Sequence, residues 1–126
     1  MEIDVLTIFP GMFAPLEESI VGRAREKGIV RLRLWNIRDF TRDRHRTVDD
    51  APYGGGGGMV MKPEPVFECF DAVKAASPTP VDAVILLAPQ GRRFDQELAK
   101  AYASLRRIAL ICGPHEGVDE RIRKGL

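Results

Sequence analysis

The stretch that most constrains the fold runs from Ile108 to Asp119. It begins with Ile-Ala-Leu-Ile-Cys, a short apolar run typical of a fully buried strand. Gly113-Pro-His-Glu-Gly117 follows and ends the strand, because proline lacks the N–H that a strand ladder needs. A helix start is expected at Asp119. Polar groups between a buried strand and a helix are where open α/β sheets bind ligands, although an ordinary strand-to-helix loop has the same pattern.

Apolar periodicity predicts an α/β fold with a largely parallel sheet, because strand and helix patterns alternate along the chain. Right-handed crossovers are expected between the parallel strands. Lys27 with Gly28 fits a helix C-terminal cap. The expected strands are Ile3–Phe9, Ile29–Ile37, Val81–Leu87 and Arg107–Cys112, and the expected helices are Phe13–Lys27, Glu64–Ala76, one capped by Asp95, and Val118–Leu126.

The 126 residues, 44% hydrophobic and 29% charged, are enough for one globular domain with a core. A net charge of +1 argues against non-specific polyanion binding by charge alone and leaves a local basic face open. Cys69 and Cys112 lie in apolar patterns, which predicts buried thiols and no disulfide. The acidic amino terminus lacks a signal-peptide pattern, and the longest apolar run, Ala83–Ala88, is too short for a bilayer. We therefore expect a cytoplasmic protein that does not enter a membrane.

A charged connection from Arg38 to Tyr53 shows neither helical nor strand periodicity and leads into five glycines, Gly54–Gly58. A connection of this length inside a compact domain is usually functional or disordered. The glycines do not form a Walker loop, because Met59 stands where that motif needs lysine, and they do not follow the first strand as a dinucleotide fingerprint requires. The neighbouring run His45-Arg-Thr-Val-Asp-Asp50 could hold a polar base or be a solvated, self-paired ion cluster.

Two strand-end loops match each other, Ala88-Pro-Gln-Gly-Arg92 and Gly113-Pro-His-Glu-Gly117. If their strands are neighbours, both loops meet at one edge of the sheet. Free backbone N–H and C=O groups there can recognise an adenine edge or a ribose, although two tight turns without a ligand have the same pattern. The serines lack a nucleophile-elbow context, and two histidines without acidic or cysteine spacing do not make a metal site. We therefore assign no metal ligand.

Taken in order, these motifs resemble the bacterial tRNA (guanine-N1)-methyltransferases (TrmD-type) of the knotted SPOUT class. The resemblance covers essentially the whole chain, and its central run from Asp39 to Met59 is long and specific. It includes Ile8-Phe-Pro-Gly-Met-Phe13, Asp39-Phe-Thr-Arg-Asp-Arg-His-Arg-Thr-Val-Asp-Asp50, Pro52-Tyr-Gly-Gly-Gly56, Pro89-Gln-Gly-Arg92, Cys112-Gly113 and Glu116-Gly-Val-Asp-Glu-Arg121.

This resemblance implies transfer of a methyl group from S-adenosylmethionine to N1 of the guanosine 3′ to the tRNA anticodon, position 37. It also implies a homodimer that binds tRNA across both subunits with magnesium assisting. A trefoil knot of three loops would hold the cofactor, and two of these loops correspond to Leu87–Arg92 and Gly113–Gly117. The implied cofactor-binding positions are Leu87, Ala88, Pro89, Gly113, His115, Glu116 and Gly117, and the implied target-base positions are His45, Asp49, Asp50, Gly57 and Gly58.

By the same resemblance, residues 1–126 are an N-terminal S-adenosylmethionine-binding domain without the C-terminal tRNA-binding domain or the third knot loop. The family's catalytic base lies beyond Leu126, so no catalytic residue is assigned, and Asp49 is a candidate for substrate positioning. Ala88 stands where the family commonly has serine, Gly57 where it has proline, and Pro114-His115 where it has Arg-Tyr. We therefore expect an incomplete knot, and weak or no cofactor binding and no activity for this chain alone.

Two other functions stay open at this point. The chain could be a non-catalytic module that dimerises or binds the cofactor weakly without turnover. An unrelated phosphate-binding protein is the weaker alternative, because no phosphate-loop motif is complete.

Overall fold

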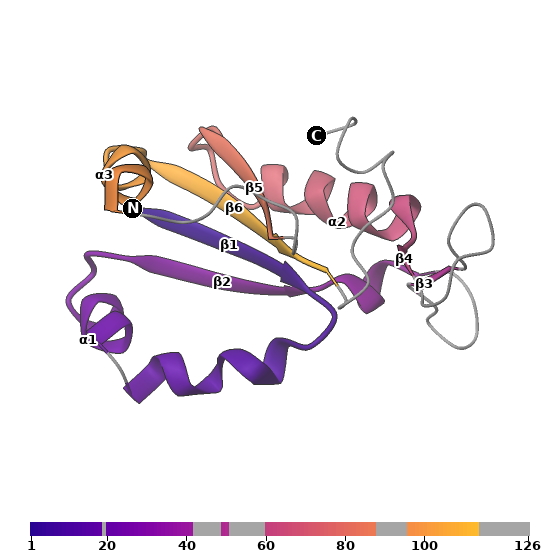
Figure 1. Cartoon of the computed structure of the whole chain (residues 1–126), viewed down its shortest axis with the longest axis horizontal. Helices are drawn as coiled ribbons and strands as arrows, with labels where there is room; N and C mark the ends of the chain where they lie inside the picture. The colour runs from indigo at the N-terminus through magenta and orange to yellow at the C-terminus, as the bar shows by residue number, and fades with distance from the viewer. Residues whose placement is uncertain (19, 42–48, 51–59, 88–95, 114–126) are drawn as a thin grey trace.

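The computed structural model describes residues 1–18, 20–41, 49–50, 60–87 and 96–113. Its main sheet has four strands in the order β2-β1-β6-β5, all parallel. Figure 1 shows the four strands side by side. The predicted α/β class with a largely parallel sheet is confirmed. The strands are β1 (Glu2–Thr7), β2 (Arg31–Asn36), β5 (Ala83–Leu87) and β6 (Arg107–Cys112).

Helical segments connect these strands, and a short hairpin adds a second sheet. In Figure 1, α1 and α3 lie near the end of the sheet where the strands begin, and the β3–β4 hairpin lies beyond the opposite end. None of the helices described is long and apolar enough to cross a membrane. The segments are η1 (Pro10–Glu18), α1 (Ile20–Glu26), η2 (Ile37–Phe40), β3 (Asp49–Asp50), β4 (Val60–Met61), α2 (Pro63–Ala75) and α3 (Gln96–Ala103).

The hydrophobic core lies between α2 and one face of the central strands. Apolar residues of α2 recur at helical spacing and form one buried stripe. Pro63 begins the helix, a position where its missing N–H costs no intrahelical hydrogen bond. The predicted helix Glu64–Ala76 is thus confirmed to within one residue at each end. The buried cluster comprises Leu6, Ile8, Ile37, Val66, Cys69, Val73, Ala109 and Ile111.

The carboxyl end of α1 is closed by a left-handed glycine. Gly28 has a φ of +74°, which L side chains rarely adopt. Its N–H donates to the carbonyl of Arg25 at 3.1 Å, and the N–H of Ile29 donates to the carbonyl of Ala24 at 2.9 Å. This pair of bonds is the Schellman motif, which satisfies carbonyls that the helix end leaves open. The predicted cap at Lys27-Gly28 is confirmed.

The expected helix from Phe13 to Lys27 is wrong in its first half. Residues Pro10–Glu18 form a 3-10 helix instead, and the α-helix begins only at Ile20. Pro15 lies inside the 3-10 segment, and its ring blocks the hydrogen bond and the space that an α-helix needs one turn earlier. The connection from Arg38 to Tyr53 also contains regular structure, since η2 and β3 lie within it.

Strand β2 lies at an edge of the sheet, and its two faces differ from the sequence pattern. In the sequence, Val30, Leu32 and Leu34 alternate with Arg31 and Arg33, a pattern that predicts one partly exposed face. Arg31 is exposed, but Leu34 is 42% exposed and Arg33 is turned toward β1. The Arg33 Nε donates to an oxygen of Asp4 at 2.7 Å. A buried carboxylate therefore reverses the polarity expected from alternation alone.

Asp4 is the centre of this buried polar network. Its carboxylate also accepts hydrogen bonds from Trp35 Nε1 at 3.0 Å and from Arg107 Nε at 2.9 Å. Burial alone would raise the pKa of Asp4, but these bonds from Arg33, Trp35 and Arg107 outweigh it and lower the pKa below its usual value. The Arg33 guanidinium also bonds Glu2 at 2.7 Å and lowers the pKa of Glu2 to about 2. The network ties together three neighbouring strands.

Candidate functional site at the carboxyl edge of the sheet

The parallel strands end together at one edge of the sheet. Cys112 is the register partner of Thr7 on one side and of Leu87 on the other. The third and fourth predicted strands are therefore neighbours, which is the condition under which their two loops were expected to meet. Gly113 follows Cys112 directly, and Leu87 is 50% exposed. Gly113 thus lies one residue beyond the last register pair of β6.

The structure describes part of each predicted set of site residues. Leu87 and Gly113 lie at this carboxyl edge, at the ends of β5 and β6. Asp49 and Asp50 form β3, where they pair with Met61 and Val60 of β4. The remaining predicted positions lie outside the described residues: Ala88, Pro89, His115, Glu116 and Gly117 of the cofactor set, and His45, Gly57 and Gly58 of the target-base set.

The β3–β4 pairing fixes where the glycine-rich segment enters and leaves. Antiparallel pairing of Asp50 with Val60 brings both ends of the stretch 51–59 together. This hairpin lies beyond the carboxyl ends of the main strands along the long axis of the molecule (Figure 1). The described members of the two predicted groups, Leu87 and Gly113 of one and Asp49 and Asp50 of the other, therefore lie toward the same end of the fold. Strands of two residues are too short to leave a periodic signal in the sequence.

Sequence reasoning missed a second pair of residues at this edge, Phe9 and Arg38. Phe9 follows β1 and is 52% exposed, and the Arg38 guanidinium carbon lies 5.8 Å from the centre of its ring. Thr7 Oγ1 accepts the Phe9 N–H at 3.0 Å, and Asn36 Oδ1 accepts the Arg38 N–H at 3.0 Å. A hydroxyl or amide two residues ahead is a local turn signal that the sequence did contain.

The two cysteines are free thiols in different surroundings. Cys69 is fully buried, as expected, and burial raises its pKa to about 12, with Asp39 and Asp4 adding to the shift. Cys112 is only half-buried, which corrects the expectation of a buried thiol, and burial still raises its pKa. Because the thiolate is the reactive form, neither cysteine is prepared for nucleophilic chemistry.

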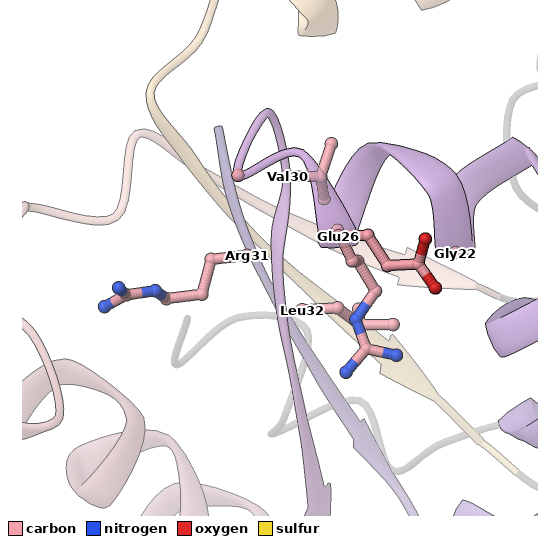
Figure 2. Close-up of a pocket in the computed structure, with 7 residues that line it drawn as sticks. Gly22, Glu26, Val30, Arg31 and Leu32 are labelled. Atoms are coloured by element: carbon pink, nitrogen blue, oxygen red, sulfur yellow. The ribbon is translucent and has the colours of Figure 1, made fainter.

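The described parts of the chain hold no group of three or more His, Cys, Asp or Glu side chains placed to bind a metal ion. A hollow of about 700 Å³ lies elsewhere, between α1 and the amino end of β2. Figure 2 shows Glu26 and Leu32 at this hollow, with Arg31 extending away from Glu26. Since β2 reaches the carboxyl edge only at Asn36, this hollow is separate from the candidate site.

The sequence is similar to those of known tRNA methyltransferases. The chain is 56% identical to a tRNA (guanine-N(1)-)-methyltransferase of Dehalococcoides mccartyi (strain ATCC BAA-2266 / KCTC 15142 / 195), over all of this chain and 51% of that protein. It is 55% identical to the Geobacter sulfurreducens protein of the same name, over 98% of this chain and 50% of that protein. The chain thus spans about half the length of these relatives.

A solved structure shows the same fold. The crystal structure of a tRNA (m1G37) methyltransferase from Aquifex aeolicus superposes with a TM-score of 0.87 at 39% sequence identity, covering 98% of this chain and 56% of that one. A profile of the family described as "tRNA (Guanine-1)-methyltransferase TrmD" matches residues 1–126. Together with the shared parallel sheet, these matches establish that the chain belongs to the tRNA (guanine-1)-methyltransferase TrmD family.

Proposed function

We propose that this chain is the N-terminal, S-adenosylmethionine-binding part of an enzyme that methylates N1 of guanosine 37 in tRNA. The observation that carries the proposal is the meeting of Leu87 and Cys112-Gly113 at one sheet edge. This is the crevice at which open parallel sheets bind nucleotides. Membership of the family, whose named relatives are tRNA methyltransferases, supplies the reaction.

The residues at this edge suit an adenosyl group because they offer main-chain groups beside an apolar surface. Leu87 and Cys112 are the last paired residues of their strands, so Gly113 lies beyond the ladder, where main-chain groups take other partners. Leu87 adds a half-exposed apolar side chain against which a base can lie. In the proposal, the cofactor is held by Leu87, Ala88, Pro89, Gly113, His115, Glu116 and Gly117, within a trefoil knot.

The target base enters from the side of the β3–β4 hairpin. Guanine N1 carries a proton, so a base must remove it before the nitrogen lone pair can attack. Negative charge then develops on O6 and needs a donor or cation. Bound S-adenosylmethionine supplies the methyl group. In the proposal, His45, Asp49, Asp50, Gly57 and Gly58 contact the guanosine, with Asp49 positioning it; no general base is assigned among them.

The proposed location, oligomeric state and partners are those expected from the family. The protein works in the cytoplasm as a homodimer that binds tRNA across both subunits, with magnesium assisting and no ligand for it assigned in this chain. The chain of 126 residues alone is expected to be inactive, because it spans only about half the length of its relatives. A non-catalytic module that dimerises or binds the cofactor weakly is the alternative.

Isothermal titration with S-adenosylmethionine tests whether residues 1–126 alone can bind the cofactor. We expect weak or no binding by residues 1–126 and clear binding by a polypeptide of the relatives' full length. Tight binding by residues 1–126 would refute the requirement for a third loop.

Transfer of a labelled methyl group from S-adenosylmethionine to tRNA tests the reaction. The full-length protein should lose all transfer when guanosine 37 is replaced by adenosine, because a site arranged to accept the N1 proton and to stabilise charge on O6 meets an unprotonated N1 and an amino group in place of O6. Undiminished transfer to the adenosine-containing tRNA would rule out the assigned reaction, and no transfer to either tRNA would favour the non-catalytic alternative.

A further inference from the structure

The carboxyl edge of the sheet has a half that the cofactor proposal does not use. The proposed cofactor loops follow β5 and β6, whereas Phe9 and Arg38 follow β1 and β2 on the other side of the same edge. Thr7 pairs with Cys112 in register, so the turn to Phe9 begins beside the strand that carries Gly113. This aromatic side chain therefore borders the proposed site.

Local hydrogen bonds hold Phe9 and Arg38 in place. The bond from the Phe9 N–H to Thr7 Oγ1 forms a turn immediately after the strand. On the Arg38 side, the N–H is bound by Asn36, and the carbonyl accepts from the Thr41 hydroxyl at 2.7 Å and from the Thr41 N–H at 3.3 Å. Both backbones are thus fixed before any ligand arrives.

Arg38 and the exposed part of the Phe9 ring together form a surface that is both aromatic and positively charged. The Arg38 guanidinium carbon lies 5.8 Å from the centre of the Phe9 ring, over one of its faces. Phe9 nevertheless remains 52% exposed to solvent. A half-exposed aromatic ring with an arginine over one face is an arrangement that can stack a nucleobase, and a positive charge beside it favours the phosphates that accompany the base. An apolar residue kept for the core would instead be covered.

We propose that Phe9, held by Arg38, stacks a base of the RNA next to the methylated guanosine. The inference rests on the proposed function only in taking RNA as the ligand. We assign the base to RNA and not to the cofactor because the proposed cofactor loops follow the other two strands of the sheet. Stacking of this kind tolerates any base, since each presents a π-face, so Phe9 holds the RNA in position without reading its sequence.

The test compares Phe9→Ala, Phe9→Trp and Met12→Ala in the full-length protein. Met12 is the matched control, because it lies in the same segment and is 74% exposed but has no ring. Dissociation constants for an anticodon stem-loop RNA are measured by fluorescence anisotropy, and those for S-adenosylmethionine by titration. Phe9→Ala should weaken RNA binding by about 5- to 100-fold, the range seen when a stacked aromatic is removed. Phe9→Trp should bind RNA within about 3-fold of the original, Met12→Ala within about 2-fold, and cofactor binding should not change.

RNAs in which each nucleotide beside the target is replaced in turn by an abasic one locate the stacked base. At one position, the abasic RNA should remove the difference between the original protein and Phe9→Ala. The inference is overturned if no position does so, or if Phe9→Ala and Met12→Ala weaken RNA binding equally. It is overturned as well if Phe9→Ala weakens cofactor binding as much as RNA binding, or changes the oligomeric state and leaves RNA affinity unaltered. If the variants show these differences in RNA binding but the protein does not methylate guanosine 37, only the proposed reaction is refuted and the inference about Phe9 stands.

Discussion

Arg107 shows how much one buried side chain can organise. It is fully buried and bonds Asp4 at 2.9 Å, the carbonyls of Thr79 at 2.7 Å and Ser77 at 3.3 Å, and the carbonyl of Val73. It therefore joins the first strand to the end of α2 and to the loop that follows. An arginine at the start of a strand usually lies in solvent, so its sequence position alone did not indicate this role.

Replacing Arg107 should destabilise the fold far more than replacing its neighbour Arg106. Arg107→Gln removes one of the two guanidinium groups that the buried Asp4 carboxylate contacts and the donor to three backbone carbonyls; breaking such a buried pair typically costs about 3–5 kcal/mol of the free energy of unfolding. Arg106 is 73% exposed and reaches Asp82 only at 4.0 Å, so Arg106→Gln should cost about 0–1 kcal/mol. Urea unfolding of the two variants checks this. Equal losses would mean that the Arg107 network contributes no more than a surface pair.

At the scale of elements, the strands and α2 could be predicted and the irregular segments could not. Apolar runs located all four main strands to within about two residues, because burial imposes a pattern on the sequence. Leu16, Ile20 and Ala24 keep helical spacing in the sequence, and this spacing predicts an α-helix where the structure has the 3-10 helix. Pro15 prevents the α-helix there, because its ring removes a hydrogen bond and clashes with the preceding turn.

The helix-ending glycine gives the clearest test at this scale. Gly28→Ala should lower the free energy of unfolding by about 1–2 kcal/mol, because a Cβ is unfavourable in the left-handed region. An added Cβ meets no atom within 4 Å, so the effect comes from the backbone alone. Gly11→Ala is the control: its Cβ also meets nothing, and its φ lies outside the left-handed region, so the change should stay within about 0.5 kcal/mol. Thermal unfolding of both variants measures the difference, and an equal response would contradict the Schellman assignment.

For the whole molecule, the candidate site was only partly foreseeable. The alternating strand and helix pattern predicted parallel strands, and the loops after Leu87 and Cys112 were expected to meet only if their strands were neighbours; the register pairing of Leu87 with Cys112 shows that the strands are. The juxtaposition of Phe9 with Arg38 depends on β2 lying beside β1, with Asn36 opposite Thr7. Strand order is a property of the complete sheet, so no local sequence pattern predicts which strand ends become neighbours.

Acid unfolding should report the carboxylates of the buried network. Folding lowers the pKa of Glu2 from 4.5 to about 2 through its bond to Arg33, and it also lowers that of Asp4. These groups therefore add stability that is fully present above about pH 5 and is lost as pH falls toward 2. The free energy of unfolding, measured by urea titration from pH 7 to pH 2, should decrease mainly below pH 4.5.

Glu2→Gln should make that acid decrease shallower, because one shifted carboxylate is gone. Asp71→Asn, at a pair with Lys74 in which both side chains are more than half exposed, should leave the slope unchanged. A slope that does not respond to Glu2→Gln would show that Glu2 does not link folding to protonation.

The central position of β1 has a consequence for how the protein is made. β1 is synthesised long before β6, one of its two neighbours in the sheet, and the Asp4–Arg107 bond spans 103 residues. During synthesis β1 can first pair only with β2, and its other edge stays unpaired until residue 112 has emerged from the ribosome. Because such distant pairing folds slowly and leaves an open strand edge, the nascent chain depends on protection from aggregation until β6 arrives.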